Sequence, residues 1–277
     1  MPERASKRRK LVQYPLVLDG QDCPSGKRTV RSKAEHLAVE QGKRVERANT
    51  LVFADFESLY HPKGHAEALF SARFGTVPRK GPFSVGCVFT PWDLRSALLE
   101  DCFNLVQRLT EDDYANSEMK WSEAKKKVEM RLPDLKYFIL TGLDGLVAVG
   151  FISFMVTYED GYEVLYIYEI HLDPEYQGKG LGKGLMLIAE RTARNIGLEK
   201  VMLTVFRSNT RAIGFYERLG YSVDKYSPQP KILRNGTLKE RSYVILSKIL
   251  GPDEAPEYSK EAETQAAKAI GNARAEF

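Results

Sequence analysis

Apolar runs divide the chain into segments whose length and spacing predict strands. Seven runs rich in β-branched and aromatic residues are bounded by Gly, Pro, Asn or Asp, as strands commonly are. They are 83–89, 137–141, 146–157, 163–172, 200–206, 221–225 and 241–249. A hairpin is expected around 142–145 and a turn at 159–161, whereas 227–240, with two prolines and a glycine, is expected only to connect the last two runs. The pattern predicts a sheet of about seven strands.

Between these runs, apolar residues recur at the three- and four-residue spacing of amphipathic helices. One helix is predicted to begin at Pro91, and a second to be capped by Thr110 and to run to about Arg131. Residues 181–196 carry one apolar helical face that ends at a glycine, and Asn209 caps a short aromatic helix. Strands that alternate with helices predict an α/β fold.

The remaining segments are expected to extend one domain, which spans 83–250 and holds every predicted strand. Residues 1–31 are polar and basic and are predicted to be a disordered tail. Residues 32–82 are predicted to form a helix over 32–60 and a loop, and we expect both to pack on the domain. Residues 251–277 are predicted to be an acidic, alanine-rich tail.

Composition and charge exclude several classes of protein. With 43% hydrophobic residues the chain can bury a sizeable core, and it has no run of 18 apolar residues, so no membrane span is expected. The first 50 residues hold 12 Lys and Arg against 6 Asp and Glu, whereas residues 51–250 carry a net charge of only +1. That balance argues against general nucleic-acid binding. Three cysteines without metal-like spacing indicate a reducing compartment and no metal site.

The first ten residues lack the apolar core of a secretory signal and contain Lys7-Arg8-Arg9-Lys10 instead. Such a cluster is typical of nuclear import signals and of contacts with acidic partners. It is equally typical of a solvated tail, so the cluster leaves these alternatives open.

The most distinctive stretch is a glycine loop between a predicted strand and a predicted helix. Its sequence, Gln177-Gly178-Lys179-Gly180-Leu181-Gly182, crowds backbone N–H groups at the helix start, an arrangement that binds anions. A helix start packed close to a strand would also carry such glycines. A Rossmann motif would need a further Gly-x-Gly and an acidic residue that ends a second strand, and a P-loop would need Gly-Lys-Ser/Thr at the required spacing. The sequence has neither.

The order of motifs around the loop resembles the GNAT acetyltransferase superfamily. An apolar strand, an Asp-Pro turn, Gln-x-x-Gly-x-Gly, a helix, a strand and Asn-x-x-Ala-x-x-Phe-Tyr-x-x-x-Gly-Tyr follow one another in the order found there. The resemblance covers about 83–250 and implies a mixed, mostly antiparallel sheet with helices on both faces. It also implies that the strand before the loop splays from its neighbour and that the pantetheine arm of CoA lies between them.

By this resemblance the loop and the preceding strand bind acetyl-CoA, the cosubstrate. Glycines leave room for the pyrophosphate, the helix dipole favours an anion, and strand backbone groups can bond the pantetheine amides like an added strand. The predicted cofactor-binding residues are Ile170, His171, Leu172, Gln177, Gly178, Lys179, Gly180, Leu181, Gly182, Lys183 and Asn209. Asn209 is also explained as a helix cap, and His171 as a structural strand residue.

A closer resemblance, to the NatD type of N-terminal acetyltransferase, concerns the acceptor. The segments that carry it are Leu165–Glu169, Tyr114–Glu118 with Trp121, Lys200–Phe206 and Ser242–Leu246. It implies direct transfer of acetyl, in a ternary complex, to the α-amino group of histone tails that begin Ser-Gly-Arg-Gly. It also implies a monomer without an auxiliary subunit, in nucleus and cytoplasm, that contacts neither nucleic acid nor membrane.

Glu169 is the predicted base, directly or through a water. An α-amino group has a reference pKa of about 7.7–8.0 and needs only a modest base, and burial would raise the pKa of Glu169 toward a useful value. Alternatively Glu169 only binds the ammonium, or lies on a polar strand face. Tyr168 and Tyr216 complete the catalytic candidates, with Tyr216 in the position of the general acid for the CoA thiolate. Core packing also explains Tyr216.

Aromatic and polar residues are predicted to line a slot for the first residues of the peptide. They are Tyr114, Tyr166, Tyr168, Glu169, Thr204, Ser227 and Tyr243. Strand alternation puts Tyr166 and Tyr168 on one face and Glu169 on the other, unless a bulge, which the family has here, re-aims it. Core packing is the alternative for each tyrosine.

Two positions depart from the NatD pattern. Thr157-Tyr158 stands where an acidic residue would meet the substrate, so either Glu159 or Asp160 supplies that contact or the contact differs, and Met119 replaces a tryptophan. Three other functions stay open: an N-terminal acetyltransferase of broader specificity, an enzyme for lysine or a small amine, and a module that binds CoA without catalysis.

Overall fold

The computed structural model describes residues 44–62, 83–88, 94–142, 145–232 and 234–251. The predicted basic tail, the acidic tail and the start of a helix at Pro91 lie outside these residues. So do the first part of the helix predicted over 32–60 and nearly all of the loop that follows it.

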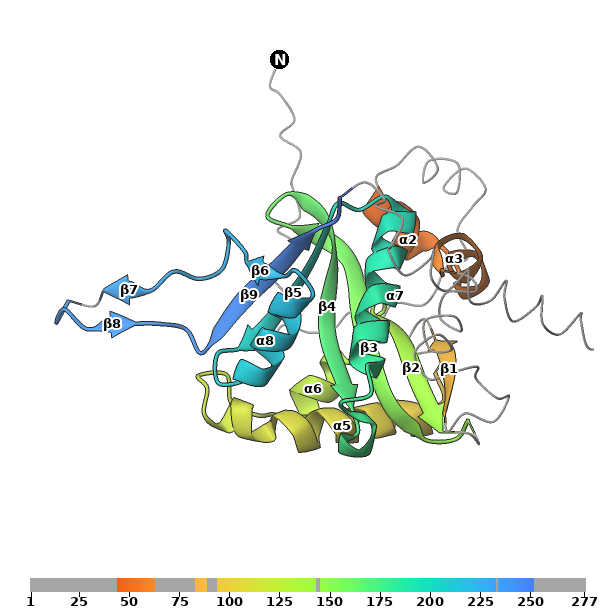
Figure 1. Ribbon diagram of the computed structural model, residues 1–277, viewed down its shortest axis with the longest axis horizontal. Helices are drawn as coiled ribbons and strands as arrows, with labels where there is room; N and C mark the ends of the chain where they lie inside the picture. The colour runs from red at the N-terminus through yellow and green to blue at the C-terminus, as the bar shows by residue number, and fades with distance from the viewer. Residues whose placement is uncertain (1–43, 63–82, 89–93, 143–144, 233, 252–277) are drawn as a thin grey trace, which may run out of the picture.

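A seven-stranded mixed sheet forms the centre of the molecule (Figure 1). The strand order is β1-β2-β3-β4-β5-β9-β6, and only the pair β4–β5 is parallel. The strands are β1 (Phe83–Val88), β2 (Lys136–Gly142), β3 (Ala148–Glu159), β4 (Tyr162–Leu172), β5 (Lys200–Phe206), β6 (Ser222–Val223) and β9 (Tyr243–Ile249). The predicted α/β fold with a mixed, mostly antiparallel sheet is confirmed.

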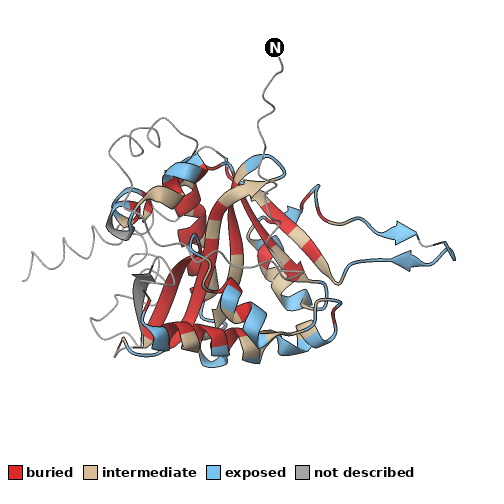
Figure 2. Cartoon of the chain, turned by 180° about the vertical axis from the view of Figure 1, so that it is seen from behind, coloured by how far each residue is buried: buried red, intermediate tan, exposed pale blue. Residues whose placement is uncertain are grey.

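Helices cover both faces of this sheet and enclose separate apolar cores. One core is formed with α2 (Arg44–Thr50), α3 (Phe53–Tyr60), α7 (Leu181–Ile196) and α8 (Thr210–Arg218). On the other face α5 (Ser96–Ala115) packs against β2 and β3, with α6 (Glu123–Glu129) beside it. Figure 2 shows the buried positions along the middle strands and on the helix faces turned toward them.

Helix α7 fixes the place of the glycine loop, because the chain runs from β4 through the 3-10 helix η1 (Pro174–Tyr176) and the loop into α7. The predicted apolar face of α7 is buried against the sheet, which confirms the helical spacing. Gly197 ends the helix with φ at +90°, a conformation that side chains other than glycine rarely adopt. The loop is thereby held at the end of β4.

The two helices predicted before β2 have different boundaries. Thr110 does not cap a helix but lies inside α5, where its hydroxyl donates to the carbonyl of Val106 at 2.7 Å. The second helix, α6, begins only after Ser122, whose side chain accepts from the amide of Lys125. The apolar spacing continues through Thr110, so tertiary packing overrides the local capping signal.

The single helix predicted over 32–60 is wrong in its described part. Two short helices, α2 and α3, are separated at Leu51 and Val52, where the backbone of Val52 is extended. Val45 and Phe56, one from each helix, are buried in the core beneath α7. The break lets both helices turn apolar residues toward the same core.

The chain between β6 and β9 also differs from the prediction. A small hairpin, β7 (Lys231–Ile232) and β8 (Leu238–Lys239), stands apart from the main sheet (Figure 1). Its turn contains Asn235-Gly236, and Gly236 has φ at +79°. An Asn-Gly pair is a strong hairpin signal, so this element was readable from the sequence. The strand predicted at 221–225 is only two residues long.

Candidate active site

β4 and β5 pair only over their first residues and then part. The parallel ladder joins Val164–Ile167 to Lys200–Leu203, and no further pair follows, although β4 continues to Leu172. The last residues of β4 therefore present backbone N–H and C=O groups toward β5 without a ladder partner there. Such an edge can accept an extended amide chain as an added strand. The expected splay of the two strands is present.

A bulge in β4 decides where Glu169 points. Ser153 pairs with Glu169 and the next residue, Phe154, pairs with Ile167, so Tyr168 is the extra residue of β4. The bulge turns Glu169 toward the α5 and α6 side, where Tyr168 also packs. The bulge expected from the family resemblance is thus found, and Glu169 shares a face with the tyrosines.

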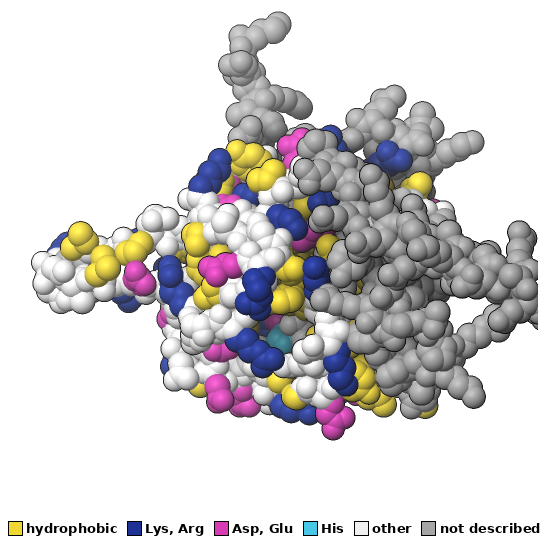
Figure 3. All heavy atoms as spheres, in the orientation of Figure 1, with side chains coloured by type: hydrophobic (Ala, Val, Ile, Leu, Met, Phe, Trp, Pro, Cys, Tyr) yellow, Lys and Arg dark blue, Asp and Glu magenta, His cyan; other side chains and the backbone are white. Residues whose placement is uncertain are grey.

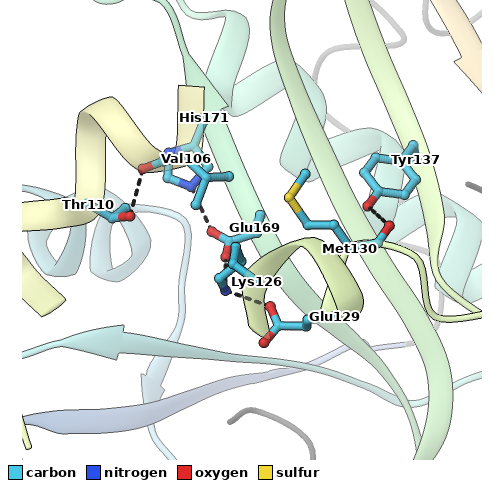
Figure 4. Close-up of polar contacts among 8 residues, drawn as sticks. All are labelled: Val106, Thr110, Lys126, Glu129, Met130, Tyr137, Glu169 and His171. Atoms are coloured by element: carbon cyan, nitrogen blue, oxygen red, sulfur yellow. Dashed lines mark hydrogen bonds and ion pairs between the residues drawn. The ribbon is translucent and has the colours of Figure 1, made fainter. Parts of the chain in front are cut away.

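The carboxylate of Glu169 contacts two side chains, those of Lys126 and His171 (Figure 4). Its Oε1 accepts from Nζ of Lys126 at 2.8 Å, and its Oε2 lies 2.7 Å from Nε2 of His171. Lys126 also donates to Glu129 at 2.6 Å, and the Lys126 side chain is only 6% exposed. The four residues form a buried chain of contacts between β4 and α6.

These contacts lower the pKa of Glu169, whereas the sequence led us to expect that burial would raise it. Burial alone would raise it, but the Lys126 ammonium and the His171 ring together lower the pKa of Glu169 to about 2. The neighbouring Glu129 has a raised pKa, because burial and the charge of Glu169 outweigh its pairing with Lys126. At neutral pH Glu169 is an anion, and the expectation that burial makes it a modest base is wrong for this state.

The glycine loop has the backbone that its sequence requires. Gly178 and Gly180 have φ at +72° and +82°, a region that favours glycine, and Gly180 is the N-cap of α7. A Cβ on Gly178 would meet no atom within 4 Å, so glycine is favoured at this position by its backbone conformation and not by lack of space. The side-chain amide of Gln177 donates to the carbonyl of Leu172 at 2.9 Å and ties the loop to β4.

Other features around the loop favour an anionic ligand. The 16-residue helix α7 begins there with its positive dipole end. Lys and Arg side chains gather on the face between α8 and the start of α7 (Figure 3). Arg108 of α5 pairs with Asp173, just before the loop, at 2.6 Å. Asn209 caps α8 by accepting from Ala212 at 3.0 Å, so the cap alternative holds and a cofactor contact stays a prediction.

Several predicted peptide residues lie together beside Glu169. The hydroxyl groups of Tyr166 and Thr204 are 2.5 Å apart, and the rings of Tyr166 and Tyr168 meet edge to face at 5.8 Å. Tyr114 packs edge to face on Phe206 at 5.0 Å, and its ring lies near Lys126. These side chains could border a narrow slot at the parted strands.

The remaining predicted residues have other surroundings. Ser227 is buried and its hydroxyl accepts from the amide of Ile245, which makes it a connection between the chain after β6 and β9. Tyr216 is buried, which raises its pKa, and the charge of Glu169 raises it further. The charge of Tyr243 contributes to the raised pKa of Tyr166, so these two lie close to each other.

Lys126 and Glu129 were not predicted as site residues. They lie three positions apart, on one side of α6, and pair with each other as such spacing allows. In the sequence they belong to the charged run Glu123–Glu129, which has the appearance of a solvated helix face. The contact of Lys126 with Glu169 spans 43 positions and has no local signature.

Within the described residues, no group of His, Cys, Asp and Glu could hold a metal ion. Across the same residues, no helix combines the length and hydropathy that a membrane span needs.

The region that contains the parted strands and the glycine loop matches a known family model. Residues 96–221, less than half of the chain, match the model of the Acetyltransferase (GNAT) family, so this region is similar to that family.

Curated relatives match parts of the same region. N-alpha-acetyltransferase 40 of Saccharomyces cerevisiae is 34% identical over 126 residues, which are 39% of this chain and 44% of the relative. L-ornithine N5-acetyltransferase NATA1 of Arabidopsis thaliana is 33% identical over 95 residues, 34% and 42% of the two chains. A mycothiol acetyltransferase of Propionibacterium freudenreichii is 37% identical over 75 residues, 27% and 24%. The chain spans less than half the length of each of these relatives.

Among solved structures, the PaiA N-acetyltransferase of Thermoplasma acidophilum in complex with coenzyme A is 21% identical, with a TM-score of 0.44. It covers 61% of this chain and all of its own. The likeness is too distant to bear on the reaction.

Proposed function

We propose that the protein transfers acetyl from acetyl-CoA to the α-amino group of histone tails that begin Ser-Gly-Arg-Gly. One observation carries the proposal: where β4 and β5 part beside the glycine loop, the carboxylate of Glu169 is held between Lys126 and His171. Donor and acceptor would meet there in a ternary complex. We further propose that the protein acts as a monomer, without an auxiliary subunit, in nucleus and cytoplasm.

The donor half rests on backbone geometry. The open edge of β4 after Ile167 would pair with the pantetheine amides, and the N–H groups from Gly178 into α7 would bind the pyrophosphate. Lys179 and Lys183 add positive charge near the phosphates. The thioester carbon would then lie close to Glu169, because cofactor and carboxylate use the same few residues of β4.

The acceptor half rests on charge. Lys126 is shared by two carboxylates, Glu129 and Glu169, so the ionised cluster keeps one net negative charge when His171 is neutral. A buried negative charge attracts an ammonium group and holds it near the thioester. Tyr166, Tyr168 and Thr204 border this place and suit a small, unbranched N-terminus. The similarity to an N-alpha-acetyltransferase supports an α-amino acceptor.

Glu159 is the candidate partner for the arginine at the third position of the peptide. By alternation it lies on the face opposite Val156 and Tyr158, and its charge raises the pKa of Tyr166, so the two are near each other. Burial and Asp160 raise the pKa of Glu159 to about 7. A guanidinium group would stabilise the ionised form of this carboxyl, and this attraction favours a basic peptide.

The proposal is tested with purified full-length protein, acetyl-CoA and three peptides. The peptides are Ser-Gly-Arg-Gly, the same peptide with a blocked N-terminus, and one with an unrelated N-terminus. We expect turnover of the first alone. In Glu169→Gln, kcat should fall by about 10²-fold or more, while acetyl-CoA affinity changes little. Glu111→Gln, on the exposed side of α5, is the matched control and should behave as wild type.

Three other results would replace the proposal. Equal turnover of the blocked peptide would exclude the α-amino group as acceptor and favour lysine. Turnover of ornithine or a similar small amine alone would favour the chemistry named for the ornithine N5-acetyltransferase relative. Binding of CoA without any turnover would indicate a module without catalysis.

A further inference from the structure

We propose that His171 accepts the proton that the substrate ammonium must lose, with Glu169 and Lys126 as the residues that position it. This inference rests on the proposed function, since it assigns the proton acceptor of that reaction. It changes the role of Glu169 from base to orienting anion.

The first support is the occupancy of the Glu169 carboxylate. One oxygen accepts from Lys126 at 2.8 Å and the other lies 2.7 Å from His171, and the side chain is only 12% exposed. A carboxylate held so strongly as an anion is a poor proton acceptor, because its pKa of about 2 lies far below that of an α-ammonium group. Histidine, with a reference pKa near 6.5, matches the substrate far better.

The second support is the direction of the proton between His171 and Glu169. Because Glu169 is ionised and can only accept, Nε2 of His171 carries the hydrogen that lies between them. Nδ1 of neutral His171 then holds the free electron pair. A carboxylate that fixes the tautomer and orientation of a histidine base recurs in hydrolytic enzymes.

The third support is the position of His171 on β4. It lies two residues beyond Glu169, in the stretch of β4 that has parted from β5 and precedes the glycine loop. Its side chain is 10% exposed and packs beside Phe151 at 5.7 Å. The residue thus borders both the place proposed for the amine and the edge proposed for the cofactor.

Lys126 makes this arrangement rigid. It is 6% exposed and spans Glu129 and Glu169, so it prevents Glu169 from turning away from His171. It also keeps Glu169 from taking the substrate proton, because the nearby ammonium stabilises the carboxylate. Lys126 and Glu169 are therefore positioning residues for His171.

In the proposed reaction the substrate nitrogen loses two protons, and a C–N bond replaces the C–S bond of the thioester. The ammonium gives one proton to Nδ1 of His171, and the imidazolium is stabilised by Glu169. The neutral amine attacks the thioester carbon; a C–N bond forms and the C–S bond breaks, with the electron pair leaving on sulfur. The second proton lost by nitrogen goes to the thiolate, for which Tyr216 is the candidate carrier, and His171 releases its proton to solvent.

Other titratable groups surround the cluster and would share its pH response. On α5 they are Tyr114 and Arg108, the latter paired with Asp173. On β2 Tyr137 feels the charges of the cluster, and on α8 Tyr216 feels that of Glu169. The three tyrosines have raised pKa values and stay neutral below pH 9, so they do not contribute a pH response near neutral pH.

The test compares the pH dependence of kcat in wild type and His171→Gln, with saturating acetyl-CoA and Ser-Gly-Arg-Gly peptide. In wild type, kcat should rise with pH through a single midpoint, because the proton acceptor must be unprotonated to act. In His171→Gln we expect kcat to fall about 10²-fold and the midpoint to move up toward about 7.7–8.0, the pKa of the amine itself. His61→Gln, at the other described histidine, is the matched control and should keep both values.

A second variant separates a proton acceptor from a structural residue. In His171→Ala, added imidazole should restore part of kcat, with the restored rate following the fraction of neutral imidazole. Thermal unfolding of each variant checks that it is folded. A wild-type-like kcat and midpoint in His171→Gln, or a loss in His171→Ala that imidazole does not restore, would overturn the inference. If wild type itself acetylates no peptide, the proposed function fails instead.

Discussion

At the scale of single residues, the site illustrates how surroundings decide the role of a carboxyl group. Glu169 and Glu159 lie on the same two-stranded unit, β3 and β4, yet their pKa values are about 2 and about 7. Glu169 faces an ammonium and a histidine, whereas Glu159 is half-buried beside another acid, Asp160. We therefore expect Glu169 to act as a fixed anion and Glu159 to respond to both pH and substrate.

The raised pKa of Glu159 predicts pH-dependent peptide binding. An arginine side chain binds the ionised carboxylate, which predominates above pH 7. Affinity for the acetylated product, acetyl-Ser-Gly-Arg-Gly, should therefore rise about tenfold from pH 6 to pH 8. The acetylated peptide has no titrating amine, and titration calorimetry in the presence of CoA measures its binding.

Glu159→Gln should bind this peptide weakly and with little dependence on pH. A peptide with Ala in place of Arg should show the same flat profile with wild-type protein. If wild-type affinity is constant from pH 6 to pH 8, Glu159 does not contact the arginine.

The sequence reveals those site residues whose signals are local. The glycine loop is recognisable because three glycines alternate at the start of an amphipathic helix, and Gly178 and Gly180 do adopt the positive φ that favours glycine. Glu169 is recognisable because it interrupts an apolar strand. Lys126 is not recognisable, because its neighbours Lys125 and Lys127 make it resemble one residue of a solvated face. Its role comes from a tertiary contact with β4, and the low pKa of Glu169 depends on that contact.

At the scale of elements, the β4 bulge and the boundaries of α5 and α6 place the site. The bulge at Tyr168 turns Glu169 toward α6, and α6 begins just after its N-cap Ser122, which places Lys126 against β4. Strands and the long helix α7 follow from periodic apolar residues. The helix boundaries near Thr110 cannot be predicted in this way. Thr110 and the acidic residues after it resemble a helix cap, but the packed face of α5 continues past them.

Two alanine substitutions test these boundaries. Thr110 lies inside α5, so Thr110→Ala should change the free energy of unfolding by no more than about 0.5 kcal/mol, since alanine is the better helix former. Ser122 caps α6, so Ser122→Ala should cost about 1 kcal/mol. Urea denaturation measures both. If Thr110→Ala lowers the free energy of unfolding more than Ser122→Ala does, a helix begins at Thr110 after all.

At the scale of the whole molecule, a segment before the matched family region supports the sheet. Asn49 of α2 donates to the carbonyl of Val156 at 2.8 Å, and Asn195 of α7 donates to the carbonyl of Tyr60 at 3.0 Å. Phe56 of α3 is 1% exposed. These contacts join α2 and α3 to the core beneath α7, whose start forms the proposed pyrophosphate site.

Phe56 is therefore predicted to contribute strongly to stability. Phe56→Ala should lower the free energy of unfolding by about 3 kcal/mol or more, because the ring is fully buried. Leu59→Ala on the same helix is the control, since Leu59 is 49% exposed and should cost well under half as much. Equal small losses in both variants would mean that α3 contributes little to the core.

The central claim is that the site acetylates an α-amino group. The most direct measurement uses the peptide Ser-Gly-Arg-Gly-Lys, which offers an α-amine and a lysine together, and locates the acetyl group by tandem mass spectrometry after brief reaction with limiting acetyl-CoA. We expect acetyl on the nitrogen of the first serine and none on the lysine. Acetyl on the lysine, with the α-amine left free, would contradict it.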